Sequence, residues 1–384
     1  MLEGVNVALG VSGSIAAVKT VELAHELRRQ GAAVRAVMTD AARGIVHPWS
    51  LEFATENDVV TEITGRVEHV ELCGREGWAD VLLLAPTTAN TAGKIASAVD
   101  DTPVTTCATV AIGADVPVVM APAMHEPMYD HPGVLEALDT LASWGVSMVD
   151  PRIEEGKAKV AAEADIVREV ARAATPDPLA GRRVVVTSGG TVERIDPVRV
   201  IANRASGRTG RAVAAACYVA GAEVVLVHDG PDVAYATTER VESAAEMLTV
   251  VEDHASDADA LVSAAAISDY TVEASDEKVR SGQDLTLELQ PTPKLVDTVR
   301  EAHPDLAIVG FKAETGGDDD AMVEHARELL DRVGAAFVVA NDASVMGRDD
   351  TRVLVVRDHA VREFVGSKTA LGAVVAEELA ADLD

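Results

Sequence analysis

The sequence contains few cysteines, few lysines and few aromatic residues. Cys73, Cys107 and Cys217 are the three cysteines among 384 residues, and their spacing argues against a disulfide framework or a thiolate zinc site. No run approaches the roughly 18 uninterrupted apolar residues of a membrane span. The opening residues MLEGVNVALG lack the basic start of a signal peptide. We therefore expect a cytoplasmic protein without a membrane partner.

Positive charge is scarce as well. The chain has 33 Lys and Arg residues, eight of them Lys, against 63 Asp and Glu, and its formal net charge is −30. Residues 1–180 carry −13 and residues 181–384 carry −17, so the acidity is spread along the chain. A non-specific nucleic-acid binder needs the opposite sign, so we expect no nucleic-acid partner. Uniform acidity with few lysines is typical of halophilic proteins, and an ordinary acidic mesophilic protein is the alternative.

The chain is long and apolar enough for two globular domains. It exceeds the ~250–300 residues at which a single core usually stops growing, and 48% of its residues are hydrophobic. The segment AATPDPLAGR at 173–182 places two prolines and a glycine between a helical stretch and a β-branched run, which is typical of a linker. We place the boundary near residue 178 and expect domains over 1–177 and 178–384.

Both halves begin with a strand, a Gly/Ser turn and a helix. In the first half, a strand at 5–9 leads into GVSGSI and a helix that ends at Gly31, before a strand at 34–39. In the second half, residues 184–187 lead into SGGT, a helix ends at Gly221, and a strand follows at 223–228. Further apolar runs predict strands at 81–85, 118–121, 260–266, 307–311 and 336–340. We expect an α/β protein with two tandem doubly wound parallel-sheet domains, flavodoxin-like or Rossmann-like.

Polar residues follow the expected strands at their carboxyl ends, where open α/β sheets bind ligands. In the first half, the turn at 10–14 precedes a helix, and its free backbone N–H groups favour a phosphate. Hydroxyls of Ser12, Ser14 and Thr39 favour a mononucleotide, and a tight connection without a ligand is the alternative. The turn lacks the third glycine of the dinucleotide fingerprint.

Two histidines lie near expected strand ends in the first half. His69 stands in VEHVEL, and His125 stands in PAMHEPM. Each by itself is more often a structural or surface histidine than a catalytic one, and Met124 and Met128 are ordinarily packing residues. However, four motifs that follow one another over residues 7–128 resemble the flavin-dependent cysteine decarboxylases. They are SGSIAA, EHVEL, WADVLLLAPTTANTAGKIA and PAMHEPM. Within that family they are most similar to the phosphopantothenoylcysteine decarboxylases of coenzyme A biosynthesis.

This resemblance implies an FMN cofactor and a decarboxylation. It assigns His69 as the active-site base, and His125 with Met124 to the substrate. Direct loss of the carboxylate would leave an unstabilised carbanion, so the flavin first oxidises the neighbouring CH₂–SH to a thioaldehyde, which acts as an electron sink. The implied FMN contacts are Ser12, Gly13, Ser14, Thr39, Thr88, Ala89 and Asn90.

The first half departs from the family pattern at two places. His125 replaces the usual asparagine that grips the substrate carboxylate, and an imidazole can donate the same hydrogen bond in a pH-dependent way. Bacterial members have a flap cysteine that protonates the product, whereas PRIEEGKAK at 151–159 has none. Either Lys157, Lys159 or a water supplies that proton, or the first activity is altered.

Arginines gather beside a glycine-rich turn in the second half. TSGGTVERIDPVR at 187–199 leads into NRASGRTG at 203–210, which brings Arg199, Arg204 and Arg208 near a helix start. The pattern favours an anion site, and arginines paired with neighbouring carboxylates are the alternative. The run resembles the phosphopantothenate–cysteine ligase signature, and so do the later segments SAAAISDY (263–270), EKVRSG (277–282), QPTPKLVD (290–297), VGFKAET (309–315) and VVAND (338–342).

The second resemblance implies activation of a carboxylate by CTP. 4′-Phosphopantothenate attacks the α-phosphate, pyrophosphate leaves, and the amine of cysteine captures the acyl-cytidylate. Asn203 would hold that intermediate, Arg199 would act in its formation or consumption, and Lys278 would neutralise the phosphates. Mg²⁺ is expected on the triphosphate, with no protein ligand assigned. The residues framing the nucleotide would be Ser263, Ala264, Ala265, Asp269, Pro293, Lys294, Leu295, Val296 and Phe311.

Together the resemblances predict a bifunctional enzyme that joins 4′-phosphopantothenate to cysteine and decarboxylates the product to 4′-phosphopantetheine. The alternatives are a flavin-binding regulatory or scaffold protein, and a ligase with an impaired decarboxylase. Two lysines usual in the helix after KAET are absent, which leaves Arg327 and Arg332 as local cations and leaves CTP or ATP preference open. We expect a homo-oligomer, with dimeric ligase domains and trimeric decarboxylase domains.

Overall fold

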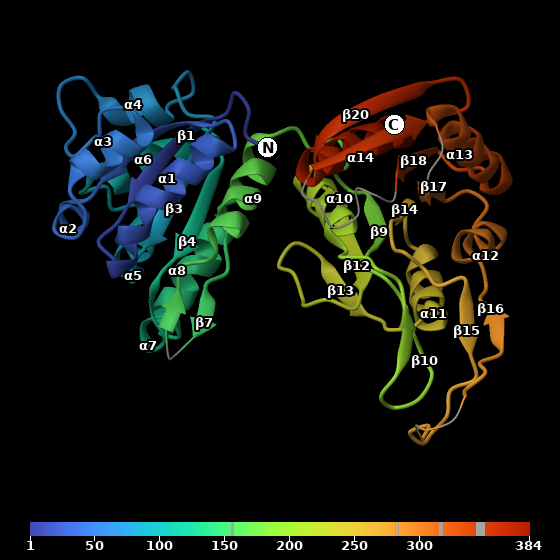
Figure 1. The fold of residues 1–384 in the computed structure, drawn as a ribbon. Coiled ribbons are helices and arrows are strands. Elements are labelled where there is room, and N and C mark those ends of the chain that lie inside the picture. The colour runs from blue at the N-terminus through green and yellow to red at the C-terminus, as the bar shows by residue number, and fades with distance from the viewer. Residues whose placement is uncertain (155–156, 281, 283, 315–317, 343–349) are drawn as a thin grey trace. The chain divides into compact units, whose positions relative to one another are not determined.

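The computed structural model describes residues 1–154, 157–280, 282, 284–314, 318–342 and 350–384 (Figure 1). The chain divides into two compact units, Met1–Thr175 and Pro176–Asp384. The boundary expected near residue 178 falls in the segment that joins α9 (Glu163–Ala174) to β9 (Arg183–Thr187). Among the described residues, no helix has the length and apolar character needed to cross a membrane.

The first unit is built on a parallel sheet. Its five strands in the described part of the chain run in the order β2-β1-β3-β4-β6, which is the order of a flavodoxin-like doubly wound fold. A smaller sheet has the order β5-β8-β7. The elements are β1 (Asn6–Val11), η1 (Ile15–Lys19), α1 (Thr20–Arg29), β2 (Ala33–Met38), α2 (Asp40–Arg43), α3 (Pro48–Thr55), α4 (Glu68–Cys73), β3 (Val81–Thr87), α5 (Ala89–Ala96), α6 (Pro103–Gly113), β4 (Val118–Pro122), β5 (Met124–His125), α7 (Glu126–Tyr129), α8 (Pro132–Ser143), β6 (Ser147–Met148), β7 (Arg152–Glu154), β8 (Lys157–Lys159) and α9.

The second unit is built on a larger sheet. In the described residues it has eight strands in the order β13-β12-β9-β14-β17-β18-β19-β20, and the first six follow a Rossmann-like order. The elements are β9, β10 (Val192–Arg194), β11 (Val200–Ala202), α10 (Arg208–Val219), β12 (Glu223–His228), β13 (Thr237–Arg240), α11 (Ala244–Ala255), β14 (Ala260–Ser263), β15 (Tyr270–Val272), β16 (Leu289–Pro291), α12 (Leu295–Ala302), β17 (Ala307–Glu314), α13 (Asp319–Val333), β18 (Phe337–Asp342), β19 (Asp350–Val356), β20 (Val361–Ser367) and α14 (Lys368–Leu383).

The expected fold class, two doubly wound α/β domains, is confirmed, with two local differences. The strand expected over 260–266 ends at Ser263 because the N–H of Ala265 donates to the Thr187 hydroxyl at 3.2 Å and the N–H of Ala266 to the Gly189 carbonyl at 2.8 Å. The chain thus leaves the ladder and forms a loop. The pair β19 and β20, which was not expected, extends the parallel sheet by antiparallel pairing on β18.

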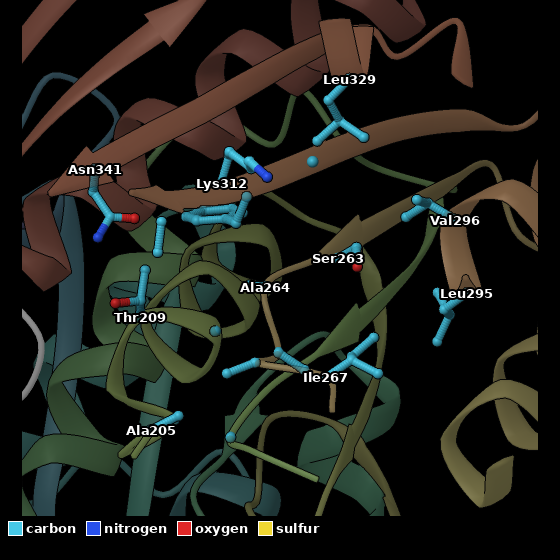
Figure 2. A pocket seen from close by; sticks show the side chains of 18 of the residues that line it. Ala205, Thr209, Ser263, Ala264, Ile267, Leu295, Val296, Lys312, Leu329 and Asn341 are labelled. Atoms are coloured by element: carbon cyan, nitrogen blue, oxygen red, sulfur yellow. The ribbon is translucent and has the colours of Figure 1, made fainter. Parts of the chain in front are cut away.

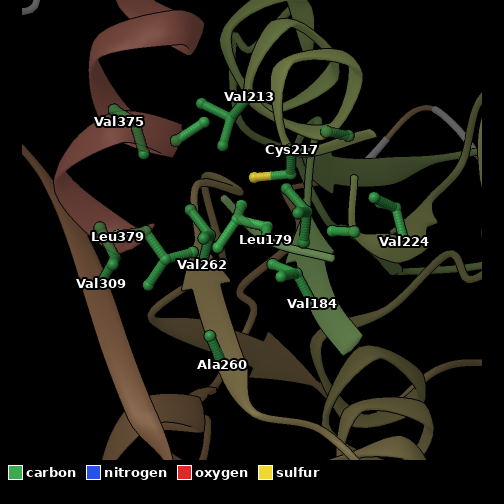
Figure 3. Packing of buried hydrophobic residues seen from close by; sticks show 14 of the residues in the cluster. Leu179, Val184, Val213, Cys217, Val224, Ala260, Val262, Val309, Val375 and Leu379 are labelled. Atoms are coloured by element: carbon green, nitrogen blue, oxygen red, sulfur yellow. The ribbon is translucent and has the colours of Figure 1, made fainter. Parts of the chain in front are cut away.

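Apolar strand residues form clusters on both faces of the larger sheet, with Val185 and Leu261 in one cluster and their neighbours Val184 and Val262 in the other. Val184, Val262 and Val309 come from three adjacent strands and are fully buried. Figure 3 shows them beneath side chains of α10 and α14, including Cys217 and Val375. A strand buried on both faces needs a continuous apolar run, which is the pattern that the sequence has here.

Candidate functional site

One serine joins two loops where the strand order of the first unit reverses, between β1 and β3. Ser12 is buried directly after β1. Its hydroxyl donates to the carbonyl of Pro86 at 2.7 Å and accepts from the N–H of Thr88 at 3.0 Å. Open α/β sheets bind ligands at such a switch point, outside the carboxyl ends of the strands. Ser12 therefore lies where a ligand of this unit is expected.

Hydroxyl groups cap three helices around this switch point. Ser14, Thr39 and Thr88 are the N-caps of η1, α2 and α5, and their side chains accept from backbone N–H groups at 3.3, 3.2 and 3.2 Å. Ala89 and Asn90 are the first two residues of α5, and Asn90 is exposed. The structure thus brings the hydroxyl residues expected at FMN to helix starts at one sheet edge.

Gly13 allows the turn after β1 to approach α2. A Cβ at this position would lie 2.4 Å from the Cβ of Ala41, closer than real contacts allow. The hydroxyl of Ser14 also donates to the carbonyl of Ala123 at 3.1 Å, so the turn is tied to the loop after β4. This crowding requires glycine and fixes where the turn lies.

His69 is the second residue of α4, next to a buried acidic residue. The Glu68 carboxylate accepts hydrogen bonds from the N–H of Thr64 at 2.8 Å and from the Thr64 hydroxyl. These hydrogen bonds lower the pKa of Glu68 from its ordinary value of 4.5 to about 2. Within the described residues, the Nδ1 atom of His69 is buried without a hydrogen-bond partner. This nitrogen therefore has unused hydrogen-bonding capacity beside Glu68.

Met124 and His125 form β5, beside the expected flap. β5 pairs with β8 in an antiparallel register that sets His125 opposite Lys157, and β8 pairs with β7. The flap is therefore a hairpin alongside the PAMH motif. Residues 155–156 and the Lys157 side chain lie outside the described part, and Lys159 ends β8.

The second unit has a pocket of about 420 Å³ at the carboxyl edge of its sheet (Figure 2). It surrounds the switch point between β9 and β14, and it lies within the size range of small-molecule sites. Gly210, near the start of α10, forms part of the wall, and a Cβ there would lie 2.6 Å from the Cβ of Ser188. Close packing of α10 on the turn after β9 thus shapes this wall.

All the residues expected to frame the nucleotide line this one pocket. Figure 2 shows side chains of the loop after β14 facing the start of α12 across it. These residues come from three separate segments and are Ser263, Ala264, Ala265, Asp269, Pro293, Lys294, Leu295, Val296 and Phe311. The structure therefore assembles one site from sequence segments as many as 48 positions apart.

Three basic side chains of the pocket were not expected from the sequence: Lys312, His325 and Lys368. Lys312 belongs to the ligase-like segment VGFKAET at 309–315, so this motif could have identified it. The last residue of the segment lies outside the described part of the chain. His325 and Lys368 lie in none of the segments that resemble the ligase. Their elements, α13 and α14, reach the pocket only through sheet packing.

Ion pairs organise the positive charge around the pocket. The Lys312 ammonium is 3.5 Å from Glu314 Oε1, which is 3.3 Å from His325 Nδ1. Lys294 pairs with Asp269, and the helix cation Arg332 lines the pocket and pairs with Asp297. Of the two cations expected on α13, Arg332 lines the pocket and Arg327 is not among the described residues that do. Arg208 of α10, expected at an anion site, lines the pocket as well, together with Lys312 of β17 and Lys368 of α14.

The three residues expected to be catalytic in the second unit are not among the described residues that line the pocket. The Asn203 amide donates to the carbonyl of Ala266 at 2.9 Å, so Asn203 lies against the pocket wall. Arg199 pairs with Asp196 at 2.7 Å, so carboxylate pairing, the alternative interpretation, holds for this arginine. Lys278 is exposed between β15 and β16. No group of three or more His, Cys, Asp or Glu side chains suited to a metal ion occurs in the described parts.

Family models match both halves of the chain. The model described as "Flavoprotein" matches residues 1–175, and the model described as "DNA/pantothenate metabolism flavoprotein C-terminal domain" matches residues 179–383. A crystal structure of the C-terminal domain of a coenzyme A biosynthesis bifunctional protein CoaBC is 30% identical and covers 54% of this chain and 98% of its own, with a TM-score of 0.47.

Curated relatives match nearly the whole length. The coenzyme A biosynthesis bifunctional protein CoaBC of Thermococcus kodakarensis is 48% identical over 366 residues, which are 94% of this chain and 91% of the relative. The protein of the same name from Methanocaldococcus jannaschii is 35% identical over 385 residues, 99% of this chain and 94% of the relative. The chain therefore belongs to the CoaBC family of bifunctional coenzyme A biosynthesis enzymes, which join a phosphopantothenoylcysteine decarboxylase domain to a phosphopantothenate–cysteine ligase domain.

Proposed function

We propose that the pocket of the second unit activates 4′-phosphopantothenate with CTP and joins it to cysteine. The observation that carries this proposal is the convergence of nine expected residues on one pocket of about 420 Å³ at the sheet's switch point. The carboxylate oxygen attacks the α-phosphate, pyrophosphate leaves, and the cysteine nitrogen then displaces CMP to form an amide. The protein contributes mainly positioning and electrostatic stabilisation.

The positive charge needed for the nucleotide phosphates is supplied by lysines in a strongly acidic chain. Lys312 extends over the pocket in Figure 2, and Lys368 lines it from α14. The Lys312 ammonium lies 3.5 Å from Glu314 Oε1. A triphosphate carries more negative charge than this carboxylate, so the ammonium pairs with the phosphates when the nucleotide binds. Magnesium enters on the triphosphate, and Asn203 contacts the acyl-cytidylate from the pocket wall.

We also propose that the first unit binds FMN at its switch point, with the phosphate at the turn of Ser12, Gly13 and Ser14. The residues fit such a group because a phosphate needs hydroxyl and backbone N–H donors at helix starts, and Ser14, Thr39 and Thr88 occupy such positions. When bound, the flavin supplies the oxidation and reduction that make loss of CO₂ feasible.

The chain's own residues bind the substrate and move protons in the first unit. His69 has a buried Nδ1 atom without a partner in the described part of the chain, and this nitrogen is the proton acceptor of the proposal. His125 is exposed beside the β7–β8 hairpin, where its imidazole can hold the substrate carboxylate. Because the flap has no cysteine, a ligase with an impaired decarboxylase is the second candidate.

Large apolar side chains on the first unit support self-association. Ile15, Trp49 and Phe53 are 78%, 73% and 76% exposed on η1 and α3. Contiguous exposed apolar side chains mark surfaces that another molecule covers, and Trp49 and Phe53 are four residues apart on one helix. We propose trimers of the first unit and dimers of the second, which sedimentation of the full chain would measure.

One assay tests the proposed reactions. Purified protein receives 4′-phosphopantothenate, cysteine, CTP and Mg²⁺ in dilute buffer and in molar KCl, and products are identified by mass spectrometry. We expect 4′-phosphopantetheine and CO₂, with higher activity in KCl because counterions screen the net charge of −30. Accumulation of phosphopantothenoylcysteine would instead favour the impaired decarboxylase. Absence of any product with either CTP or ATP would favour a flavin-binding scaffold.

A further inference from the structure

A buried carboxylate outside the pocket links two distant segments of the second unit. Asp196 lies in the loop between β10 and β11, and its side chain is 0% exposed. Its Oδ1 atom accepts from the N–H groups of Val198 at 2.7 Å and Arg199 at 2.8 Å. Its Oδ2 atom accepts from Arg199 Nη1 at 2.7 Å and from the N–H of Val279 at 3.1 Å. Both carboxylate oxygens are therefore occupied by hydrogen-bond donors.

Arg199 makes a second connection to the segment that contains Val279. Its Nη1 group also donates to the carbonyl of Val279 at 2.9 Å. The N–H and C=O groups of one residue, Val279, are thus both held by the Asp196–Arg199 ion pair. A second contact lies close by, where the N–H of Ser275 donates to the carbonyl of Ile195 at 2.9 Å. The loop that bears Asp196 therefore holds the segment after β15 at two points.

Lys278 lies between these two attachment points. It is exposed and belongs to an irregular segment between β15 and β16, which form only a two-stranded sheet. A flexible lysine on such a segment loses backbone and side-chain entropy when it binds phosphates. The hydrogen bonds to Val279 order the backbone next to Lys278 before the phosphates bind. Lys278 therefore loses less conformational entropy on binding.

We propose that Asp196 is a positioning residue of the ligase, which acts with Arg199 as a clamp on Val279 and so presents Lys278 to the phosphates of the nucleotide. The proposal rests on the proposed ligase function. Arg199 was expected to act directly at the reacting atoms. In this proposal its role is structural, because it holds Val279 together with Asp196. Burial acts to raise the pKa of Asp196, but the backbone N–H donors and Arg199 outweigh it and lower that pKa, so the clamp is charged at neutral pH.

The substitution Asp196→Asn tests the clamp, with Asp232→Asn as its matched control. Asp232 also pairs with an arginine, Arg240 at 3.0 Å, but both side chains are exposed and lie outside the clamp. Trypsin cleavage after Lys278 and Arg280 is followed by mass spectrometry well below the unfolding temperature. We expect Asp196→Asn to speed cleavage at these sites by about tenfold or more, since local opening controls proteolysis. The control should match the wild type.

A measurement on the unaltered protein covers the case in which Asp196→Asn does not fold. Hydrogen exchange resolved to single amides should show slower exchange at Val279 than at Lys278 and Arg280 on either side. Equal exchange at all three amides would overturn the clamp, because the Val279 N–H would then have no lasting partner.

A double-mutant cycle distinguishes positioning from a general loss of stability. Lys278→Met, Asp196→Asn and the double variant are compared in ligase turnover. We expect Asp196→Asn to lower ligase kcat by about tenfold or more with little change in KM for cysteine, and Lys278→Met to cost much less in the Asp196→Asn background. Additive effects, or faster trypsin cleavage with unchanged kcat, would overturn the proposal. Wild-type protein without ligase activity would refute the proposed function, whereas the cleavage and exchange results would still report on the clamp.

Discussion

The hydroxyl of Ser12 accepts a hydrogen bond from the N–H of Thr88 at 3.0 Å and thereby joins the loops after β1 and β3. These residues lie 76 positions apart in the chain, but the strand order makes their loops neighbours. The same hydroxyl donates to the carbonyl of Pro86 in β3 at 2.7 Å, so it holds the end of β3 at two points. The proposed FMN site therefore depends on a contact between residues that are distant in sequence.

Replacing Ser12 by alanine should weaken flavin binding. The change removes the hydroxyl and leaves the Pro86 carbonyl and the Thr88 N–H without this partner, at a cost of about 1–3 kcal/mol. We expect faster loss of flavin absorbance on dialysis and unchanged ligase activity. Ser143→Ala is the control, because the exposed Ser143 hydroxyl makes a comparable bond to Thr140 at 2.6 Å. Full flavin retention by Ser12→Ala would contradict the proposed site.

His69→Asn should remove decarboxylation alone. Loss of the proposed proton acceptor is expected to slow CO₂ release from phosphopantothenoylcysteine by about 10²–10⁴-fold. Ligase activity should remain, because His69 belongs to the first unit. His131→Asn is a suitable control, since His131 is the N-cap of α8 and asparagine is also a good N-cap. Equal loss of both activities in His69→Asn would be inconsistent with independent sites.

Asn203→Asp should remove ligation alone. The substitution replaces an amide that donates to Ala266 at 2.9 Å by a carboxylate that faces the same carbonyl and repels phosphates. We expect a ligase loss of about a hundredfold or more. Asn57→Asp makes the same chemical change at a side chain that donates to Val34 at 2.9 Å in the first unit. Ligase activity should survive that control, and a normal rate in Asn203→Asp would exclude Asn203 from the site.

Lys312→Ala should weaken nucleotide binding. With this pocket cation removed, Glu314 faces the triphosphate without its lysine partner, so KM for CTP should rise by about tenfold. Initial rates of pyrophosphate release across CTP concentrations measure the effect. Arg327→Ala is the control, because Arg327 is an exposed residue of α13 and is not among the described residues that line the pocket. An equal rise in KM for CTP in both variants would indicate that Lys312 acts through the net charge of the region and not through contact with the nucleotide.

Glu68→Gln should cost stability in a pH-dependent way. The folded-state pKa of Glu68 is about 2, below its ordinary value of 4.5, so its charged form stabilises the fold above about pH 4.5. This contribution is lost as the pH falls from 4.5 towards 2. The difference in urea midpoint between wild type and Glu68→Gln should thus be constant near neutral pH and shrink on acidification. Glu71→Gln, at an exposed pair with Arg35, should show little difference at any pH. A difference in urea midpoint that grows on acidification would contradict stabilisation by the ionised Glu68.

Much of the fold was predictable because its signals are local. Apolar runs such as Val81–Thr87, with every residue buried, identify strands covered on both faces. Gly13 and its flanking hydroxyls mark a strand-to-helix turn, and right-handed crossovers between successive strands predict parallel sheets. The pair β19 and β20 was missed because antiparallel extension of a parallel sheet depends on which edge is left open, and an isolated strand pattern does not report this.

Motifs of adjacent residues were enough to identify the two α/β units and the family, and they predicted nine residues that line the pocket of the second unit. The folded arrangement alone brings Lys312, His325 and Lys368 into one pocket and places Asp196 against Val279, 83 positions away. Such contacts arise from sheet packing and loop closure, and neither residue of a pair signals its partner locally. Strand order sets which side chains are neighbours in a doubly wound fold, whereas sequence motifs record only chain order.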